Sequence, residues 1–317
     1  MSIRRRAITA AVGIVAALPA ALCAHGAEPI ALGGPAMGTV WRVTLAAPIA
    51  DRSSGAIHRE IEAVLARLDR ALSTWRDDST VSRFNGAAAD EWIAIDRDLA
   101  AVVAACRSVH AASGGAFDPT VLPLVEAWQS GTPAPTALAA ARMAVGFDLV
   151  ESREAAGTAV LRKRRAGVRL DLGGIGPGWA VDALGDRLVE LGSGNHLVCL
   201  GGECRSWGER APGRPWQVHL DPAGPGAPAR SVDLPAGMAL ATSTSRPGRS
   251  PIDPRTGRVV AGAATGVTIR GSSCALADAW AVALLVQSAD PGWPSRQTGQ
   301  LPSGSTLERI GGPPAPR

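Results

Sequence analysis

The 317-residue sequence contains no tyrosine, only three phenylalanines and a single lysine, Lys163. Aromatic side chains make up 4% of the chain, and its formal net charge of +4 comes from arginines that are scattered apart from two clusters, 4–6 and 162–165. Nucleic-acid binding normally needs a basic stripe interleaved with aromatic stacking platforms, so this composition argues against it. At 46% hydrophobic residues, the chain is long enough to bury a substantial core in one large domain or two modest ones.

Long apolar runs are also scarce, and the first one lies at the N-terminus. Residues 1–26 have three arginines, an apolar run from Ala7 to about Leu22, and small residues near Ala24, which together resemble a secretory signal peptide. The pair Arg5-Arg6 loosely matches the twin-arginine export pattern. The residue before Cys23 is Leu22, whereas a lipoprotein cleavage site has a small residue before its cysteine, so lipidation of Cys23 is disfavoured. We therefore expect a periplasmic protein, either free or associated with the inner membrane.

Four cysteines remain after the signal peptide: Cys106, Cys199, Cys204 and Cys274. Their spacing matches no common zinc pattern. Export permits disulfides, and Cys199 with Cys204 is the nearest pair, but a chain of this size does not require a covalent staple. The sequence leaves both states of this pair open.

The hydrophobic periodicity predicts an α+β protein. Residues 39–47 read as a strand, and amphipathic or apolar helices are expected over 56–75, 98–113 and 136–146. From residue 159 onward, short strands broken by glycines alternate with two helices, 180–193 and 275–287. Residues 291–317 are rich in Pro, Gly and Ser and read as a poorly ordered tail. The expected fold is a helical N-terminal half packed on a mixed, mainly antiparallel sheet.

The glycine-rich stretch DLGGIGPGWAVD, residues 171–182, could bind an anion. It reads as a strand, a turn and a helix start, and the backbone N–H groups of such a turn can cradle a pyrophosphate. The pattern is neither a Rossmann fingerprint nor a P-loop. A tight turn that uses glycine only for positive φ is the alternative.

Two further stretches carry polar groups in places that need an explanation. Residues 253–257, DPRTG, can form a β-turn, and a plain hairpin connector is the alternative reading. Asp278 lies inside an otherwise apolar helix, where a carboxylate is costly unless it is paired, caps a helix or holds a metal.

Seven such blocks follow one another in a recognisable order. They are AMGTVWRV, LSTWRDDSTVSRFN, GAFDPTVLPLVEAW, LDLGGIGPGWAVDAL, LVCLGGE, ALATSTS with IDPRTG, and ALADAWAVAL. The series, from about residue 36 to 288, resembles the FAD:protein FMN transferases, the ApbE-like family. The resemblance implies a single ApbE-like, T-fold-related domain over residues 27–290. It also implies an exported enzyme that binds FAD, uses Mg²⁺, and transfers FMN to a Thr or Ser hydroxyl of a partner protein with release of AMP.

The resemblance also assigns roles to residues of this chain. Met37 and Thr39 would lie near the flavin, Trp75 against a ring, and Phe117, Asp118, Thr120, Asp182 and Ser243 along the nucleotide. Gly174 belongs to the turn that would face the pyrophosphate. Asp278 and the carbonyl of Gly176 would hold the metal, and Glu203 stands where the family has Asp. Asp253 and Ser250 stand at the catalytic turn.

Three positions depart from the family pattern. Pro177 replaces a lysine, Ser250 replaces a histidine, and Val282 replaces a metal-binding threonine, so a cation, a base and an oxygen ligand are lost. An arginine such as Arg246 or Arg249, or Lys163, could supply the missing positive charge, because arginine neutralises phosphate as well as lysine does. His196 and His219 are candidates for the missing base.

The sequence therefore supports three hypotheses for the function. The first is an exported flavin transferase with a variant site. The second is a catalytically impaired flavin-binding accessory protein of an extracytoplasmic electron-transfer system. The third is a scaffold that binds no flavin and keeps the glycine and DPRTG turns for architecture alone.

Overall fold

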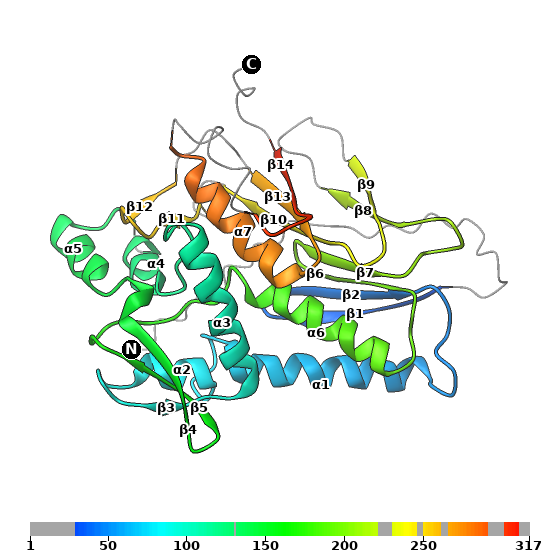
Figure 1. Ribbon diagram of the computed structural model, residues 1–317, viewed down its shortest axis with the longest axis horizontal. Helices are drawn as coiled ribbons and strands as arrows, with labels where there is room; N and C mark the ends of the chain where they lie inside the picture. The colour runs from blue at the N-terminus through cyan, green and yellow to red at the C-terminus, as the bar shows by residue number, and fades with distance from the viewer. Residues whose placement is uncertain are drawn as a thin grey trace.

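The computed structural model describes residues 29–129, 131–220, 230–245, 250–260, 266–290 and 301–310; the expected signal peptide, Arg246 and Arg249 lie outside them. Its centre is a seven-stranded sheet in the order β1-β2-β6-β7-β10-β13-β14 (Figure 1). The strands are β1 (Ile30–Ala36), β2 (Thr39–Leu45), β6 (His196–Leu200), β7 (Glu203–Trp207), β10 (Ala239–Thr244), β13 (Gly266–Gly271) and β14 (Thr306–Ile310).

Helices α1 (Ser54–Leu72), α6 (Gly176–Glu190) and α7 (Cys274–Gln287) cover one face of this sheet (Figure 1). Helix α1 is amphipathic, and its inward stripe of Ile57, Ile61 and Leu68 is fully buried because apolar residues recur three and four positions apart. Helix α7 is apolar nearly all round, which is typical of a helix with neighbours on every side. It packs against β10, β13 and α6.

The other face of the sheet is covered by a hairpin, β8 (Trp216–Leu220) with β9 (Arg230–Leu234). Trp216 and Val218 of the hairpin form a second apolar cluster with Leu197 of β6 and Leu240 of β10. Every residue of β6 is buried, because both faces of this central strand are covered.

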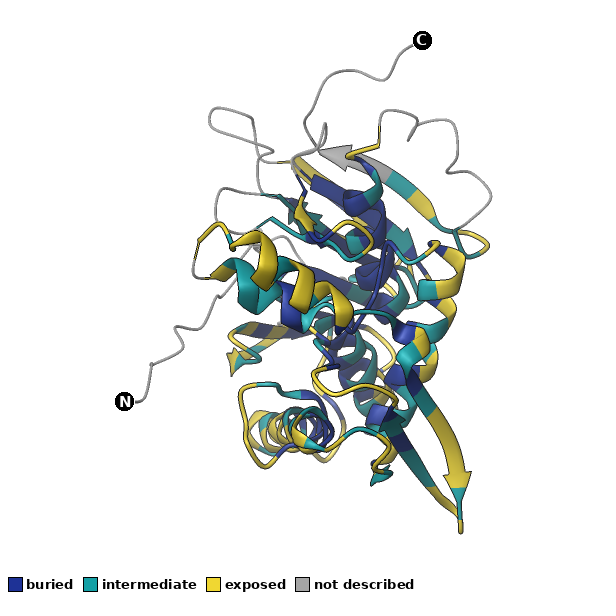
Figure 2. Cartoon of the chain, turned by 90° about the vertical axis from the view of Figure 1, so that its left-hand side faces the viewer, coloured by how far each residue is buried: buried dark blue, intermediate teal, exposed yellow. Residues whose placement is uncertain are grey.

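The smaller elements lie at one end of the sheet. The helices are α2 (Thr80–Gly86), α3 (Arg97–Ala112), α4 (Leu122–Gln129), α5 (Pro135–Met143) and the 3-10 turn η1 (Phe147–Leu149). A three-stranded sheet in the order β3-β5-β4 and a two-stranded ribbon of β11 and β12 accompany them. These strands are β3 (Ile93–Ala94), β4 (Val150–Ala155), β5 (Thr158–Lys163), β11 (Ile252–Asp253) and β12 (Arg258–Val259). Figure 2 shows buried residues concentrated in the interior and exposed residues on the outer faces.

The structure confirms the α+β architecture and corrects three details of it. Among the described residues the main sheet is entirely antiparallel rather than mixed, and the one parallel bridge, Val121 with Arg169, is isolated. Residues 306–310, expected in a disordered tail, form β14 and pair with β13, because the run TLERI is strand-forming although its flanks are rich in Pro and Gly. Strand β1, which was not predicted, pairs with β2 along its whole length.

No helix in the part of the chain that the structure describes combines the length and the apolar character needed to cross a bilayer.

Candidate functional site

The glycine-rich stretch forms a tight turn over residues 171–175, and helix α6 begins directly after it at Gly176. Pro177 fits this helix start because the N–H groups of the first turn have no intrahelical partner. Gly178 is required for another reason. A Cβ atom there would lie 2.5 Å from the carbonyl oxygen of Cys274 at the start of α7, so the two helix starts touch through backbone. At Gly176 a Cβ would meet nothing within 4 Å.

Most N–H groups of this stretch already have partners within the protein. The hydrogen bonds run from Gly173 to Asp171 Oδ1 (2.8 Å), from Ile175 and Gly176 to Leu172 O (3.2 and 2.7 Å), from Gly178 to Asp278 Oδ2 (3.1 Å) and from Trp179 to Ile175 O (2.9 Å). Pro177 has no N–H. Among the described residues, Gly174 therefore carries the only N–H of 173–179 that has no partner.

The surroundings of Gly174 bring two of the predicted site residues together. A Cβ atom at Gly174 would lie 3.0 Å from Val282 Cγ2 and 3.4 Å from Phe117 Cε2. Val282, the glycine turn and the loop that carries Phe117 thus meet at one point. The absence of a side chain at Gly174 is what permits this close approach.

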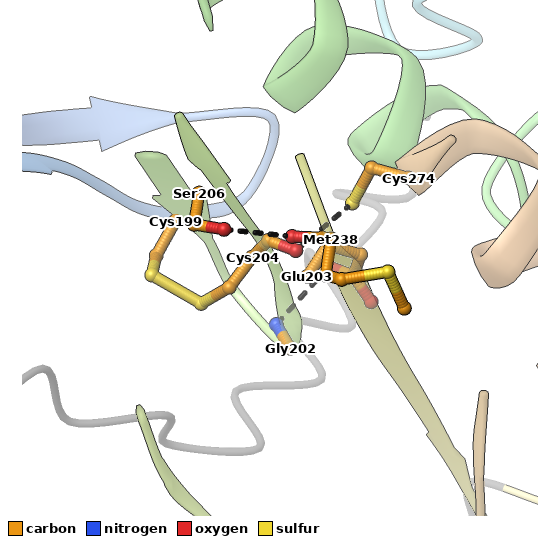
Figure 3. The surroundings of a disulfide bond; sticks show 7 residues. All are labelled: Cys199, Gly202, Glu203, Cys204, Ser206, Met238 and Cys274. Carbon is orange, nitrogen blue, oxygen red and sulfur yellow. Dashed lines mark hydrogen bonds between the residues drawn. A yellow bond between two sulfur atoms is a disulfide. The ribbon is translucent and has the colours of Figure 1, made fainter. Parts of the chain in front are cut away.

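Two buried acidic residues lie behind the turn, Asp278 on α7 and Glu203 at the start of β7. Burial raises the pKa of Asp278 to about 7. Burial, together with the charge of Asp278, raises the pKa of Glu203 well above its usual value. Glu203 Oε2 accepts from the N–H of Gly202 at 3.0 Å (Figure 3). In the described ranges no basic side chain forms an ion pair with either carboxylate.

This acidic pair is suited to a divalent cation. Two adjacent carboxylates in a buried place disfavour ionisation unless a positive charge joins them. Magnesium is commonly held by one or two carboxylates together with substrate phosphates. Within the described residues no group of three or more His, Cys, Asp and Glu side chains could hold a metal, so a cation bound by this pair would also need water, backbone or substrate oxygens. Gly176 is the first residue of α6, and the metal contact predicted for its carbonyl stays a prediction.

Asp118 and Thr120 organise the loop that carries Phe117. Asp118 Oδ1 accepts from both the N–H and the hydroxyl of Thr120, at 2.8 and 2.5 Å, and its Oδ2 accepts from Phe147 N at 3.1 Å. The Thr120 hydroxyl accepts from Gly146 N at 2.8 Å. The structure thus gives these residues a positioning role, and direct contact of theirs with a nucleotide stays a prediction.

The DPRTG turn forms as predicted. Gly257 has φ +73° and donates its N–H to Asp253 O at 2.7 Å. The Asp253 carboxylate pairs with Arg255 through Oδ1 (2.9 Å) and Oδ2 (3.1 Å). Ser250 lies beside Ser245, with 2.8 Å between the two hydroxyl oxygens. Asp253 therefore begins a folded turn, Ser250 precedes it in the chain, and the chemistry of both residues stays a prediction.

The other residues that were predicted to lie along FAD are exposed or half-buried. Trp75, in the loop after α1, has 57% of its surface exposed, so its ring is available for stacking. Met37 occupies the β1–β2 turn with φ +47°, and Thr39 Oγ1 lies 3.3 Å from the Cβ position of Gly201 in the β6–β7 turn. Ser243 is half-buried on β10. No hydrogen bond or ion pair joins these four residues to one another in the described structure.

The candidate replacements for the lost groups lie elsewhere. Lys163 is buried, donates to Asn85 O (2.8 Å) and Val168 O (3.1 Å), and has its pKa lowered by burial. Lys163 therefore holds the backbone that precedes the glycine turn, and it does not take the place of the lysine that the family pattern has where this chain has Pro177. His196 is buried against Trp207, and His219 pairs with Ser231 on the β8–β9 hairpin, which covers the opposite face of the sheet. Within the described residues no hydrogen bond or ion pair joins either histidine to the DPRTG turn.

Sequence reasoning missed two residues that shape the turn. The side chain of Asn85 donates to and accepts from the backbone of Leu170, at 2.9 and 2.7 Å, which fixes the segment that enters the turn. Burial, with the nearby charge of Glu126, raises the pKa of Asp171. Asp171 was visible in the sequence as the first acidic residue of the stretch, whereas the reciprocal bond of Asn85 spans 85 positions.

A disulfide joins Cys199 to Cys204, the pair that the sequence left open (Figure 3). The two residues face each other across the β6–β7 ladder, which explains how neighbours in sequence meet. Cys106 and Cys274 are free and buried, and Cys274 Sγ donates to Cys204 O at 3.7 Å. The disulfide therefore braces the hairpin whose turn leads into Glu203.

Comparison with known proteins places this arrangement in a family. The ApbE family profile matches residues 37–295. The chain belongs to the ApbE family. A relative from Vibrio cholerae named FAD:protein FMN transferase is 31% identical over 312 residues, covering 92% of this chain and 91% of the relative. A protein of the same name from Haemophilus influenzae is 30% identical and covers 90% of this chain.

Solved structures of the ApbE family agree in fold. The Vibrio cholerae flavin transferase ApbE superposes with a TM-score of 0.73 at 30% identity, covering 82% of this chain and 87% of that protein. The apo form of the Pseudomonas stutzeri flavinyl transferase ApbE gives 0.73 at 31% identity, with 82% and 85% covered. The single α+β domain expected from the sequence is thereby confirmed.

Proposed function

We propose that this protein is an FAD:protein FMN transferase, which moves FMN from FAD to a Thr or Ser hydroxyl of a partner protein and releases AMP. The observation that carries the proposal is the buried pair of Glu203 and Asp278 beside a glycine turn with one free N–H, in a chain of the ApbE family. The relatives with that enzyme name cover nearly the whole chain. A flavin-free scaffold would have no use for a buried acidic pair that costs stability.

In the transfer, the hydroxyl oxygen of the acceptor attacks the phosphorus of the FMN half of FAD, and the phosphoanhydride bond to AMP breaks. Such a site has to neutralise pyrophosphate charge and align the hydroxyl with the leaving group. Asp278 and Glu203 would hold Mg²⁺, and the bound ion would neutralise charge on the phosphates. The free N–H of Gly174 would donate to a phosphate oxygen.

The acceptor hydroxyl also has to lose a proton, and this chain lacks the histidine that the family pattern has there. Asp253, with Ser250 beside the same turn, is our candidate for receiving it. Among the described residues, Asp253 Oδ2 accepts only from Arg255, at 3.1 Å, so it retains a lone pair. The exposed ring of Trp75 would stack on a ring of FAD.

We also propose that the protein works in the periplasm, free or associated with the inner membrane, on an acceptor belonging to a redox complex there. The signal-like N-terminus motivates this proposal. The Cys199–Cys204 disulfide supports it, because disulfides persist in oxidising compartments.

A second candidate function is a catalytically impaired flavin-binding accessory protein. It is favoured by the three replaced positions, since Pro177 brings no cation and Val282 no oxygen to the point where Gly174 offers its N–H. Loss of a general base alone slows such reactions about a hundredfold to ten-thousandfold. This candidate predicts a yellow protein that keeps FAD intact during long incubation with Mg²⁺.

An envelope extract from the native host, prepared without this protein, provides a pool of acceptors for the test. The purified protein is added with FAD and Mg²⁺, and covalent flavin is detected as fluorescent bands on a denaturing gel. Transferase activity predicts bands that require the protein, FAD and Mg²⁺ together, with Asp278→Asn as the inactive control. Retained, intact FAD without such bands would favour the accessory protein.

A further inference from the structure

Asp182, on α6, accepts four hydrogen bonds from two other elements. Its Oδ1 accepts from Arg205 Nη1 at 2.7 Å and from Cys274 N at 3.0 Å. Its Oδ2 accepts from Ser273 Oγ at 3.0 Å and from Ala275 N at 3.1 Å. A carboxylate offers about four lone-pair positions, two on each oxygen. All of them are occupied, so Asp182 has no acceptor left for a ligand hydroxyl.

The donors come from the two elements that carry the acidic pair. Arg205 stands two residues after Glu203 on β7, and residues two apart in a strand face the same side of a sheet. Cys274 stands four residues before Asp278 on α7, one helical turn away on the same face. Asp182 therefore joins β7 to α7 at points two residues from Glu203 and four residues from Asp278.

Backbone contacts make the same junction rigid. Gly178, one turn before Asp182 on α6, has no room for a side chain against Cys274, and its N–H donates to Asp278. The guanidinium of Arg205 also lies over the ring of Trp207, 4.7 Å from its centroid. Helix α6 thus contacts the first turn of α7 at two positions, through Asp182 and through Gly178.

We propose that Asp182 is a positioning residue of the transferase, which sets the separation between Glu203 and Asp278 so that they bind one divalent cation together. The proposal rests on the function proposed above, and it replaces the nucleotide contact that the family resemblance implied for Asp182. The negative charge of Asp182 also suits the N-terminus of α7, where the helix dipole is positive.

The test measures binding of Mn²⁺, as a probe for the Mg²⁺ site, by the loss of the free-ion electron paramagnetic resonance signal. FAD affinity is measured separately by fluorescence quenching. Asp182→Asn keeps the side-chain shape but removes the charge and one acceptor oxygen. Ser273→Ala removes the donor to Asp182 Oδ2 together with the N-cap acceptor for Leu276 N, and Ser273→Thr restores both. Asp186→Asn is the matched control, since Asp186 is exposed one turn further along the same helix.

We expect Asp182→Asn to weaken Mn²⁺ binding about tenfold, the lower end of what loss of a residue supporting metal ligands costs. Ser273→Ala should weaken it about threefold, while Ser273→Thr and Asp186→Asn stay within about twofold of the wild type. FAD affinity should change by less than about twofold in all four. If Asp182→Asn does not fold, as judged by thermal unfolding, the Ala and Thr variants at Ser273 decide the question.

Three results would overturn the proposal: unchanged Mn²⁺ binding in Asp182→Asn, a loss of FAD affinity larger than the loss of Mn²⁺ affinity, or no Mn²⁺ binding by the wild type. Failure of the proposed function has a separate signature. A wild-type protein that binds Mn²⁺, loses that binding in Asp182→Asn and labels no acceptor would retain the positioning role and refute the transferase.

Discussion

At the scale of single residues, the two glycines at the start of α6 differ in the space that a side chain would find. Gly178 faces the backbone of Cys274, so a Cβ would be forced to within 2.5 Å of a carbonyl oxygen. Gly176 faces open space, and alanine there would only restrict the unfolded chain. The sequence shows two similar glycines, and only the approach of α7 distinguishes them.

Replacing these glycines one at a time tests that contact. Gly178→Ala is expected to lower the free energy of unfolding by about 2 kcal/mol through overpacking. Gly176→Ala should raise it by about 0.5 kcal/mol. Urea denaturation followed by circular dichroism measures both. Equal effects of the two substitutions would mean that α6 and α7 do not touch at this point.

A single substitution also tests the role of Val282. Threonine has nearly the shape of valine, so Val282→Thr would return an oxygen beside Gly174 and Phe117 without a large change in packing. We expect the Mg²⁺ concentration for half-maximal AMP release to fall about threefold or more. Val282→Ala is the control for space alone. An equal gain in Val282→Ala would show that room, and not the oxygen, limits the wild type.

At the scale of elements, the β6–β7 hairpin contains a histidine that has to stay neutral. His196 is fully buried, its ring stacks on Trp207 with 4.8 Å between centroids, and burial lowers its pKa to about 4. The unfolded chain therefore binds a proton at a higher pH than the folded chain does. The stability contributed here is complete above pH 6.5 and is lost progressively as the pH falls toward 4.

The His196→Phe variant should lack that loss. Between pH 6.5 and about 4 the wild type is expected to lose about 1.4 kcal/mol of unfolding free energy per pH unit more than the variant does. His219→Asn, on the β8–β9 hairpin, is the control and should keep the wild-type slope. Identical slopes for wild type and His196→Phe would show that His196 is protonated in the folded protein.

The edges of the sheet show what sequence patterns could not predict at this scale. Periodicity predicted strands β2, β6, β10 and β13 and helices α1, α3, α5, α6 and α7 within a few residues, but it did not predict the central strand β7. Strands β1 and β14, at the two edges, were missed. Gly33, Gly34 and Pro35 look like a breaker, yet proline is tolerated at an edge because one side of the strand needs no donor.

Part of the candidate site could also be predicted from the sequence. Asp278 and the glycine turn were found because a buried carboxylate and closely spaced glycines are unusual in sequence. The partners of the turn were not, because Gly178 bonds to a residue one hundred positions away. For the same reason Asp182 was assigned to the nucleotide, although its four donors come from β7 and from the start of α7.

At the scale of the whole molecule, one continuous sheet connects the halves of the chain, and β14 closes its far edge. A chain ending at Asp290 would leave β13 with an unpaired edge over five residues. We expect it to melt about 4 °C or more below the wild type and to aggregate more readily. A chain ending at Gly312 keeps β14 and serves as the control. Equal melting temperatures for the shorter chain and the wild type would show that β14 does not contribute to the sheet.

The most direct measurement of the central claim is AMP release from FAD by the purified protein with Mg²⁺ and an acceptor-containing envelope extract, quantified by chromatography. The account predicts AMP in equal amount to the flavin that becomes covalently bound, and none of either with Asp278→Asn or with a metal chelator. AMP release by the wild type no greater than in a protein-free control would contradict it.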